Sequence, residues 1–158
     1  MAKIFAGSEV VELGIQIEKN GKDFYEILAK RMNLKEIQDV FVYLAGEEQK
    51  HIADFKGILK TVEDYQPVEA YPGEYFAYMK ALASEYVFTK KDKGAEIANK
   101  IKSDKEALDM GIAFEKDSIV FYEGIKKAVP EYEHKVITKL ISQEQNHLAK
   151  LYQLKNKI

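Results

Sequence analysis

The second half of the chain repeats two stretches of its first half. The first pair is GIQIEKNGKDFYE at 14–26 and GIAFEKDSIVFYE at 111–123; the second is LAGEEQKHIA at 44–53 and LISQEQNHLA at 140–149. Repeated leucines could follow from repeated helices alone. The usual preference at an inward helical position is for leucine or alanine, so glutamates and histidines that recur on the apolar lines need another reason. The repeat therefore points to two matching units that bring polar groups inside.

The spacing of apolar residues predicts an all-α protein. Three prolines and nine glycines leave long stretches unbroken, and apolar residues recur every three or four positions. Asn33 with Glu36, and Ser103 with Glu106, form capping-box signatures of helix starts. Ser8 can cap the first helix, and a proline at 130 suits the first turn of the last one. We expect helices at about 8–31, 33–60, 73–89, 103–128 and 130–156, with a helical turn near 95–101.

These helices predict a ferritin-like four-helix bundle made of two antiparallel hairpins. Each hairpin has a short turn, and the two are joined by a long crossover that begins with the proline-containing segment 61–72 and contains the extra helix at 73–89. We expect 1–158 to form a single domain. The aromatic face of the extra helix should pack on the bundle or on a second subunit.

The repeated polar residues should meet at mid-height in the bundle. In each hairpin, a lone glutamate precedes the turn by about as many residues as the glutamate of a Glu-x-x-His pair follows it. Each helix rises ~1.5 Å per residue, so the two glutamates share a height, and each histidine lies on the same face one turn along. Six side chains should converge: Glu18, Glu48, His51, Glu115, Glu144 and His147.

Four buried carboxylates repel one another unless protons or cations compensate them. Two divalent ions would supply the missing charge, with two shared glutamates and one glutamate plus one histidine on each ion. Mixed carboxylate and imidazole ligation suits iron or manganese, and also zinc. One glutamate from each of two helices plus Glu-x-x-His from the other two is the ligand set of ferritin-like dimetal bundles.

The motif set resembles the rubrerythrin branch of the ferritin-like superfamily. It comprises two Glu-x-x-His pairs, two lone glutamates and a tyrosine seven residues after each lone glutamate. The resemblance implies two iron ions held by the six residues, and an oxidoreductase of peroxidase or ferroxidase type that reacts with hydrogen peroxide or dioxygen. It also implies that Tyr25 and Tyr122 donate hydrogen bonds to ligand carboxylates, and it leads us to expect a homodimer.

Two features depart from that family. Rubrerythrins usually carry a rubredoxin domain with four cysteines, whereas this chain has no cysteine, so a separate electron-donor protein such as a rubredoxin would be needed. The family also has an additional glutamate three residues after the position of Glu115, where this chain has Ser118. Because Ser118 replaces that additional glutamate, we expect a more symmetric, ferritin-like site.

Three simpler interpretations remain open at individual positions. The two tyrosines can fill the core with their hydroxyls bonded elsewhere. Glu47 neighbours Glu48, but its counterpart in the repeat is a glutamine, so we assign Glu47 to the surface. Glu131 and His134 also form Glu-x-x-His, but they have no counterpart in the first hairpin, and we interpret them as an exposed pair at a helix start.

Alternatives for the whole protein are a metal-binding or iron-handling protein without turnover and a structural bundle with a vestigial site. A net charge of −2 gives no reason to expect nucleic acid or an anionic membrane as partner. The opening MAKIFAGSEV lacks a sustained apolar segment, and no run approaches the ~20 apolar residues of a membrane span. We expect a cytoplasmic protein.

Overall fold

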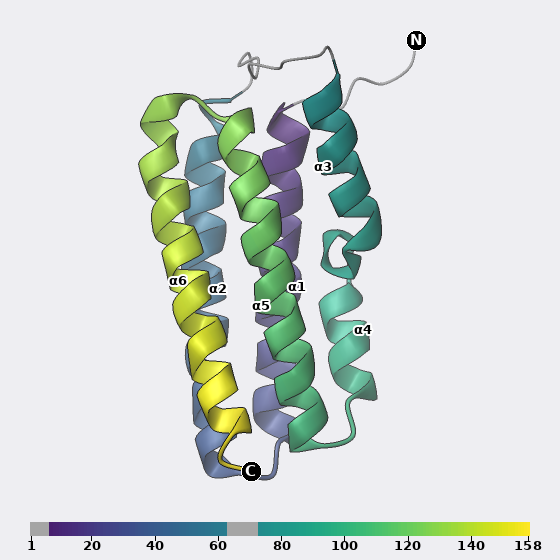
Figure 1. Cartoon of the computed structure of the whole chain (residues 1–158). Coiled ribbons are helices and arrows are strands. Elements are labelled where there is room, and N and C mark those ends of the chain that lie inside the picture. Colours follow the sequence, from purple (N-terminus) through teal and green to yellow (C-terminus); the bar gives the residue numbers. More distant parts are fainter. Residues whose placement is uncertain (1–6, 63–72) are drawn as a thin grey trace.

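Two antiparallel helical hairpins lie side by side and are linked by a crossover with shorter helices (Figure 1). The computed structural model describes residues 7–62 and 73–158, and all regular structure in these ranges is helical. The hairpins are α1 (Gly7–Arg31) with α2 (Lys35–Leu59), and α5 (Asp104–Ile125) with α6 (His134–Lys155). The crossover contains α3 (Glu74–Glu85) and α4 (Lys93–Lys100), and the 3-10 turns are η1 (Val87–Thr89), η2 (Lys126–Ala128) and η3 (Glu131–Glu133). The predicted all-α topology is confirmed.

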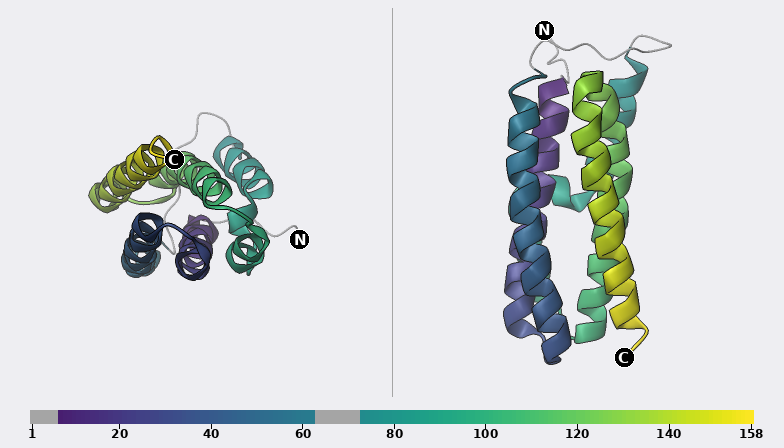
Figure 2. Two further views of the ribbon diagram at one scale, coloured as in Figure 1. Left: turned by 90° about the horizontal axis from the view of Figure 1, so that it is seen from below. Right: turned by 90° about the vertical axis from the view of Figure 1, so that its left-hand side faces the viewer.

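The crossover helices cover one side of the bundle. Seen end-on in Figure 2, α2, α1 and α4 form one row, and α6, α5 and α3 form the other. Helix α4 and turn η1 pack on α1, and α3 packs on α5. The α1/α5 side is therefore covered, while among the described residues no helix lies over the α2/α6 side. None of these described helices is both long and apolar enough to span a membrane.

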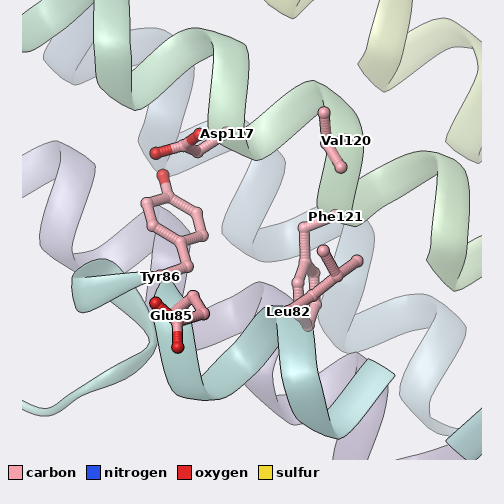
Figure 3. Close-up of a pocket in the computed structure, with 6 residues that line it drawn as sticks. All are labelled: Leu82, Glu85, Tyr86, Asp117, Val120 and Phe121. Carbon is pink, nitrogen blue, oxygen red and sulfur yellow. The ribbon is translucent and has the colours of Figure 1, made fainter. Parts of the chain in front are cut away.

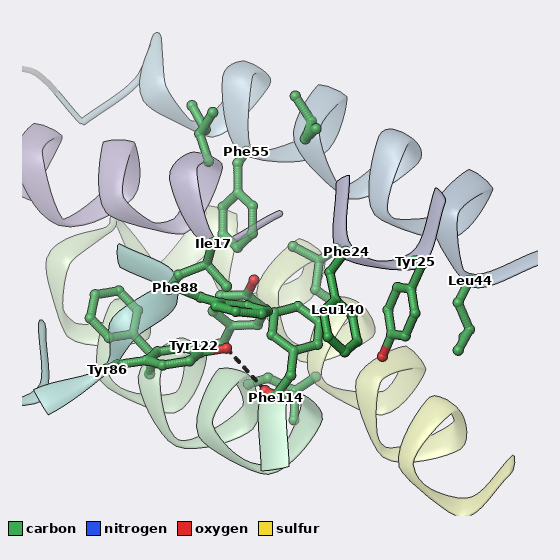
Figure 4. Close-up of a cluster of buried hydrophobic side chains, with 14 of the residues drawn as sticks. Ile17, Phe24, Tyr25, Leu44, Phe55, Tyr86, Phe88, Phe114, Tyr122 and Leu140 are labelled. Carbon is green, nitrogen blue, oxygen red and sulfur yellow. Dashed lines mark hydrogen bonds between the residues drawn. The ribbon is translucent and has the colours of Figure 1, made fainter. Parts of the chain in front are cut away.

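Aromatic side chains join the crossover to the hairpins (Figure 4). Phe88 of η1 lies 4.7 Å from Phe114 and 5.7 Å from Phe24, measured between ring centroids. The Tyr86 hydroxyl donates to the carbonyl of Phe114 at 3.0 Å. These contacts bury large apolar surfaces while the phenol keeps a hydrogen-bond partner. Most of the expected aromatic face is thus packed on the bundle, although Tyr78 is 52% exposed.

A buried asparagine ties the crossover to α1. The Asn20 side-chain nitrogen donates to the carbonyls of Phe88 at 2.6 Å and Lys90 at 2.7 Å. Its side-chain oxygen accepts the backbone N–H of Gly94 at 3.0 Å. One amide side chain thereby binds three backbone groups between η1 and the start of α4 and holds this part of the crossover to α1.

Two predicted caps are wrong. The chain is already helical at Gly7, the first described residue, so Ser8 lies within the first turn of α1. Leu34 rather than Asn33 is the N-cap of α2, and no side chain caps that helix. Instead, the carboxylate of Asp104 accepts the backbone N–H groups of Asn33 and Leu34, each at 2.9 Å. These two charge-assisted bonds hold the turn before α2 to the start of α5 in the other hairpin.

Three predicted helices are divided. The expected helix at 103–128 changes to the turn η2 after Ile125. The expected helix at 73–89 ends at Glu85, because Tyr86 is extended (φ −92°, ψ 108°) and its ring is buried against α5. The expected helix at 130–156 opens with the turn η3, and α6 begins only at His134. The turn near 95–101 is confirmed as α4. The Ser103 cap is also confirmed, since its hydroxyl accepts the N–H of Glu106 at 3.1 Å. Most of the predicted proline-containing segment, residues 63–72, lies outside the described residues.

We predict that Gly94→Ala destabilises the protein by about 1–3 kcal/mol, the usual cost of overpacking. A Cβ at this position would lie 2.0 Å from the backbone oxygen of Asn20 and 2.6 Å from its carbonyl carbon, so α1 and α4 would have to separate. Urea unfolding at fixed pH measures the change.

Gly57→Ala is the matched control. A Cβ there meets no atom within 4 Å, so the substitution should stabilise α2 by about 0.5–1 kcal/mol through helix propensity. Equal unfolding free energies for the two variants would contradict the close approach of α4 to α1.

Candidate metal centre

All six predicted residues meet in the middle of the bundle. The lone glutamates come from α1 and α5, and the Glu-x-x-His pairs come from α2 and α6. The four carboxylates are fully buried and the two imidazoles are 1% exposed. The residues concerned are Glu18, Glu48, His51, Glu115, Glu144 and His147. The sequence repeat therefore placed them correctly, and their role as metal ligands stays a prediction.

The six side chains form two overlapping sets of ligand atoms. Within each set, one ligand atom from each residue lies within 4.8 Å of the others. One set is Glu18, Glu48, His51 and Glu144; the other is Glu48, Glu115, Glu144 and His147. Glu48 and Glu144 belong to both, so these two carboxylates are placed to bridge two cations. Each set is completed by one further glutamate and one histidine.

Both histidines turn Nδ1 toward the carboxylates. His51 Nδ1 lies 2.7 Å from Glu144 Oε1 and 3.4 Å from Glu18 Oε1. His147 Nδ1 lies 3.7 Å from Glu48 Oε1 and 3.8 Å from oxygens of Glu115 and Glu144. The two rings are stacked, with centroids 5.7 Å apart and planes 18° from parallel.

The centre contains an unusual number of unsatisfied polar atoms. In the described part of the chain, eight buried side-chain atoms lack a hydrogen bond of acceptable geometry, and all eight belong to these six residues. They are Glu18 Oε2, both oxygens of Glu48, His51 Nδ1, Glu115 Oε2, both oxygens of Glu144 and His147 Nδ1. Buried polar atoms almost always have a partner. Carboxylate oxygens and imidazole nitrogens facing one another without protein partners fit divalent cations.

Burial and mutual repulsion perturb the titration of these groups. Burial and neighbouring Glu144 raise the pKa of Glu115 well above its usual value, and burial and Glu18 raise the pKa of Glu144. Burial lowers the pKa of His51, but the carboxylates of Glu18 and Glu144 outweigh it and raise that pKa to about 11. Burial dominates at His147 and lowers its pKa. Positive charge therefore stabilises the cluster, whether protons or cations supply it.

Two tyrosines hold the lone glutamates from the opposite hairpin. Tyr25 of α1 donates to Glu115 Oε1 of α5 at 2.7 Å, and Tyr122 of α5 donates to Glu18 Oε1 of α1. Burial and the adjacent carboxylate raise each phenol's pKa well above its usual value, so both hydroxyls keep their protons. Each lone glutamate consequently has one oxygen fixed and the other unpartnered.

The outer nitrogens of the two histidines face different partners. Gln143 Oε1 lies 2.9 Å from His51 Nε2, whereas Glu47 Oε2 lies 3.9 Å from His147 Nε2. A proton on His51 Nε2, donated to the Gln143 oxygen, leaves Nδ1 available to a cation. Glu47 is only 9% exposed, so our assignment of it to the surface was wrong. In the repeat, Glu47 aligns with Gln143, the partner of His51. This alignment could have indicated that Glu47 lies beside His147.

The remaining candidate positions lie apart from the cluster. Glu131 is exposed, and His134 Nε2 lies 3.2 Å from the backbone oxygen of Val129, so the third Glu-x-x-His pair has a local role. Ser118, in place of the family's additional glutamate, is fully buried, and its hydroxyl lies 2.9 Å from that of Tyr86. A neutral hydrogen-bonded pair occupies that side of the centre.

We predict that the metal-free protein loses stability as the pH rises from about 7 to about 9. Folded His51 holds a proton up to a pKa of about 11, whereas the unfolded chain releases it near 6.5. The raised pKa values of Glu115 and Glu144 act in the same direction, and His147 is neutral in both states in this range. Each extra proton held by the folded state gives a slope of about 1.4 kcal/mol per pH unit.

Urea unfolding in the presence of a chelator measures this slope. His51→Asn removes the proton-binding group and should flatten it. An identical slope in that variant would contradict the charge distribution described above.

Comparisons with known proteins agree with this geometry. The sequence matches the family model of rubrerythrin over residues 9–155. The structure is similar to the crystal structure of a Thermotoga maritima protein provisionally described as a ferritin-like diiron-carboxylate protein, with a TM-score of 0.73 and 29% sequence identity, covering 99% of this chain and 98% of that one. No curated protein matches the sequence. With a ferritin-like fold and a buried carboxylate–histidine cluster in place, the chain belongs to the rubrerythrin family.

Proposed function

We propose that this protein binds two iron ions and is a non-haem di-iron oxidoreductase that reacts with hydrogen peroxide or dioxygen. The observation that carries the proposal is a set of eight buried ligand atoms, on four glutamates and two histidines, that lack a hydrogen bond of acceptable geometry. The similar Thermotoga maritima structure is described in diiron-carboxylate terms, which favours iron over manganese or zinc.

The bound ions would supply the electrons that reduce the oxidant. Glu48 and Glu144 would bridge them, Glu18 with His51 would complete one position, and Glu115 with His147 the other. Burial of all six side chains excludes bulk water, which strengthens every electrostatic interaction inside the cluster.

Tyr25 and Tyr122 would orient the two terminal carboxylates. Because both phenols keep their protons, each would fix one oxygen of a lone glutamate, Glu115 or Glu18, through a hydrogen bond. A fixed carboxylate loses less entropy when it binds a cation, so this arrangement prepares the site in advance.

Returning the oxidised ions to the reduced state requires electrons from outside the chain. The sequence contains no cysteine that could hold a rubredoxin-type iron centre. We therefore propose a separate electron-donor protein, and a homodimer as the assembly. Gel filtration separates a dimer from the closed shell that iron storage would need.

The function is tested by loading the protein with iron without oxygen. We expect two iron ions per chain and a near-ultraviolet absorption that appears in the oxidised form and is lost on reduction. Hydrogen peroxide or dioxygen should restore it. If the reduced, loaded protein responds to neither oxidant, the enzyme proposal is wrong and an iron-handling role without turnover remains.

We predict that Glu48→Ala loses most of the bound iron, because Glu48 contributes an oxygen to both sets of ligand atoms. Elemental analysis after loading and desalting measures the loss. Glu131→Ala is the matched control, since it removes the glutamate of the exposed Glu-x-x-His pair and should leave the iron content unchanged. Equal iron content in both variants would indicate a vestigial site.

A further inference from the structure

The buried centre needs a route to solvent, and the crossover side does not provide one. Two hollows lie on that side, between α3 and α5. The first holds about 100 Å³ and is lined by Leu82, Glu85, Tyr86, Asp117, Val120 and Phe121 (Figure 3). The second holds about 180 Å³ and is lined by Tyr75, Tyr78, Glu123, Gly124 and Lys127. Neither lining contains a residue of the centre. The Tyr86 hydroxyl is held by the Phe114 carbonyl and the Ser118 hydroxyl, and aromatic rings fill the space behind it.

The opposite side, between α2 and α6, has a hollow that reaches the centre directly. It holds about 260 Å³ and is lined by Tyr43, Glu47, Ser142, Gln143, Asn146 and His147. His147 is a member of the cluster, so one imidazole separates this hollow from the buried carboxylates. Gln143, which bonds to His51, lies in the same wall.

Glu47 supplies the negative charge of this hollow. One of its oxygens is bound by Lys50 Nζ at 2.9 Å, and the other faces His147 Nε2 at 3.9 Å. Lys50 is 75% exposed in its side chain and can swing into solvent at little cost. The Glu47 carboxylate thus lies between the solvent and a predicted ligand of the centre.

A further hollow shows that size alone does not make a route to the centre. It lies between α1 and α2, holds about 270 Å³ and is lined by Lys19, Lys22, Asp23, Gln49, Ile52 and Lys56. No member of the centre lines it. Of these hollows, the one between α2 and α6 combines a carboxylate with contact to the centre.

We propose that the α2/α6 hollow is the port through which divalent cations reach the centre, and that Glu47 is its cation-binding residue. The inference rests on the proposed metal binding and adds where the ions pass. A carboxylate at the mouth raises the local concentration of cations and accelerates their capture. Glu47 does not belong to either set of ligand atoms, so its removal should change the rate of loading while the number of bound ions stays the same.

The test is the rate of Co²⁺ uptake by the metal-free full chain, followed by visible absorption in a stopped-flow instrument. We expect Glu47→Gln to slow uptake by about tenfold or more, within the range that electrostatic focusing gives, and to reduce the dependence of the rate on salt. Lys50→Gln should act with the opposite sign and accelerate uptake. Asp23→Asn in the α1/α2 hollow is the matched control and should load at the wild-type rate.

The final Co²⁺ count separates this inference from the proposed function. A wild-type protein that takes up no Co²⁺ would refute the metal centre itself. Two ions per chain in every variant, with Glu47→Gln as fast as wild type or Asp23→Asn equally slow, would overturn the port alone. A lower final count in Glu47→Gln would also overturn it, because Glu47 would then act in the centre and not on the way to it.

Discussion

The structure depends on how four buried carboxylates are tolerated inside a helical bundle. An isolated ionised carboxylate is among the most costly groups to bury, and the four glutamates of the centre are fully buried within reach of one another. The raised pKa values of Glu115, Glu144 and His51 show the same demand for positive charge that two divalent cations would meet. The two hairpins therefore pack most stably when protons or cations balance the negative charge of the four carboxylates.

Each hairpin helps to stabilise the buried carboxylates by binding the lone glutamate of the other hairpin. Each lone glutamate is fixed by a tyrosine from the other hairpin, so the hydrogen bonds run crosswise between α1 and α5. The crossover then covers the α1/α5 side. Asn20 binds it by hydrogen bonds, and Phe88 packs on Phe24 and Phe114. The α2/α6 side carries the histidines and stays open to a hollow. One side therefore fixes the lone glutamates, and the other carries the proposed port.

The sequence predicted the bundle and the six cluster residues because both follow from periodicity and from the repeat. It failed where a partner came from a distant segment. Asp104 binds the turn before α2, and no local pattern could show that a carboxylate of the second hairpin lies there. Glu47 was missed because its burial depends on the neighbouring α6, even though its alignment with Gln143 marked the position. Short-range rules identify faces of helices, whereas contacts between hairpins depend on the assembled fold.

The repeat is most informative where it is imperfect. Within the cluster, both halves contribute a lone glutamate, a bridging glutamate, a histidine and a tyrosine, so the inner set is symmetric. The residues next to the cluster do not follow the repeat. His51 bonds to the neutral Gln143, whereas His147 faces the charged Glu47. Outer partners set the orientation and basicity of ligand imidazoles. The two histidines therefore differ in their outer partners, on the side where the hollow opens.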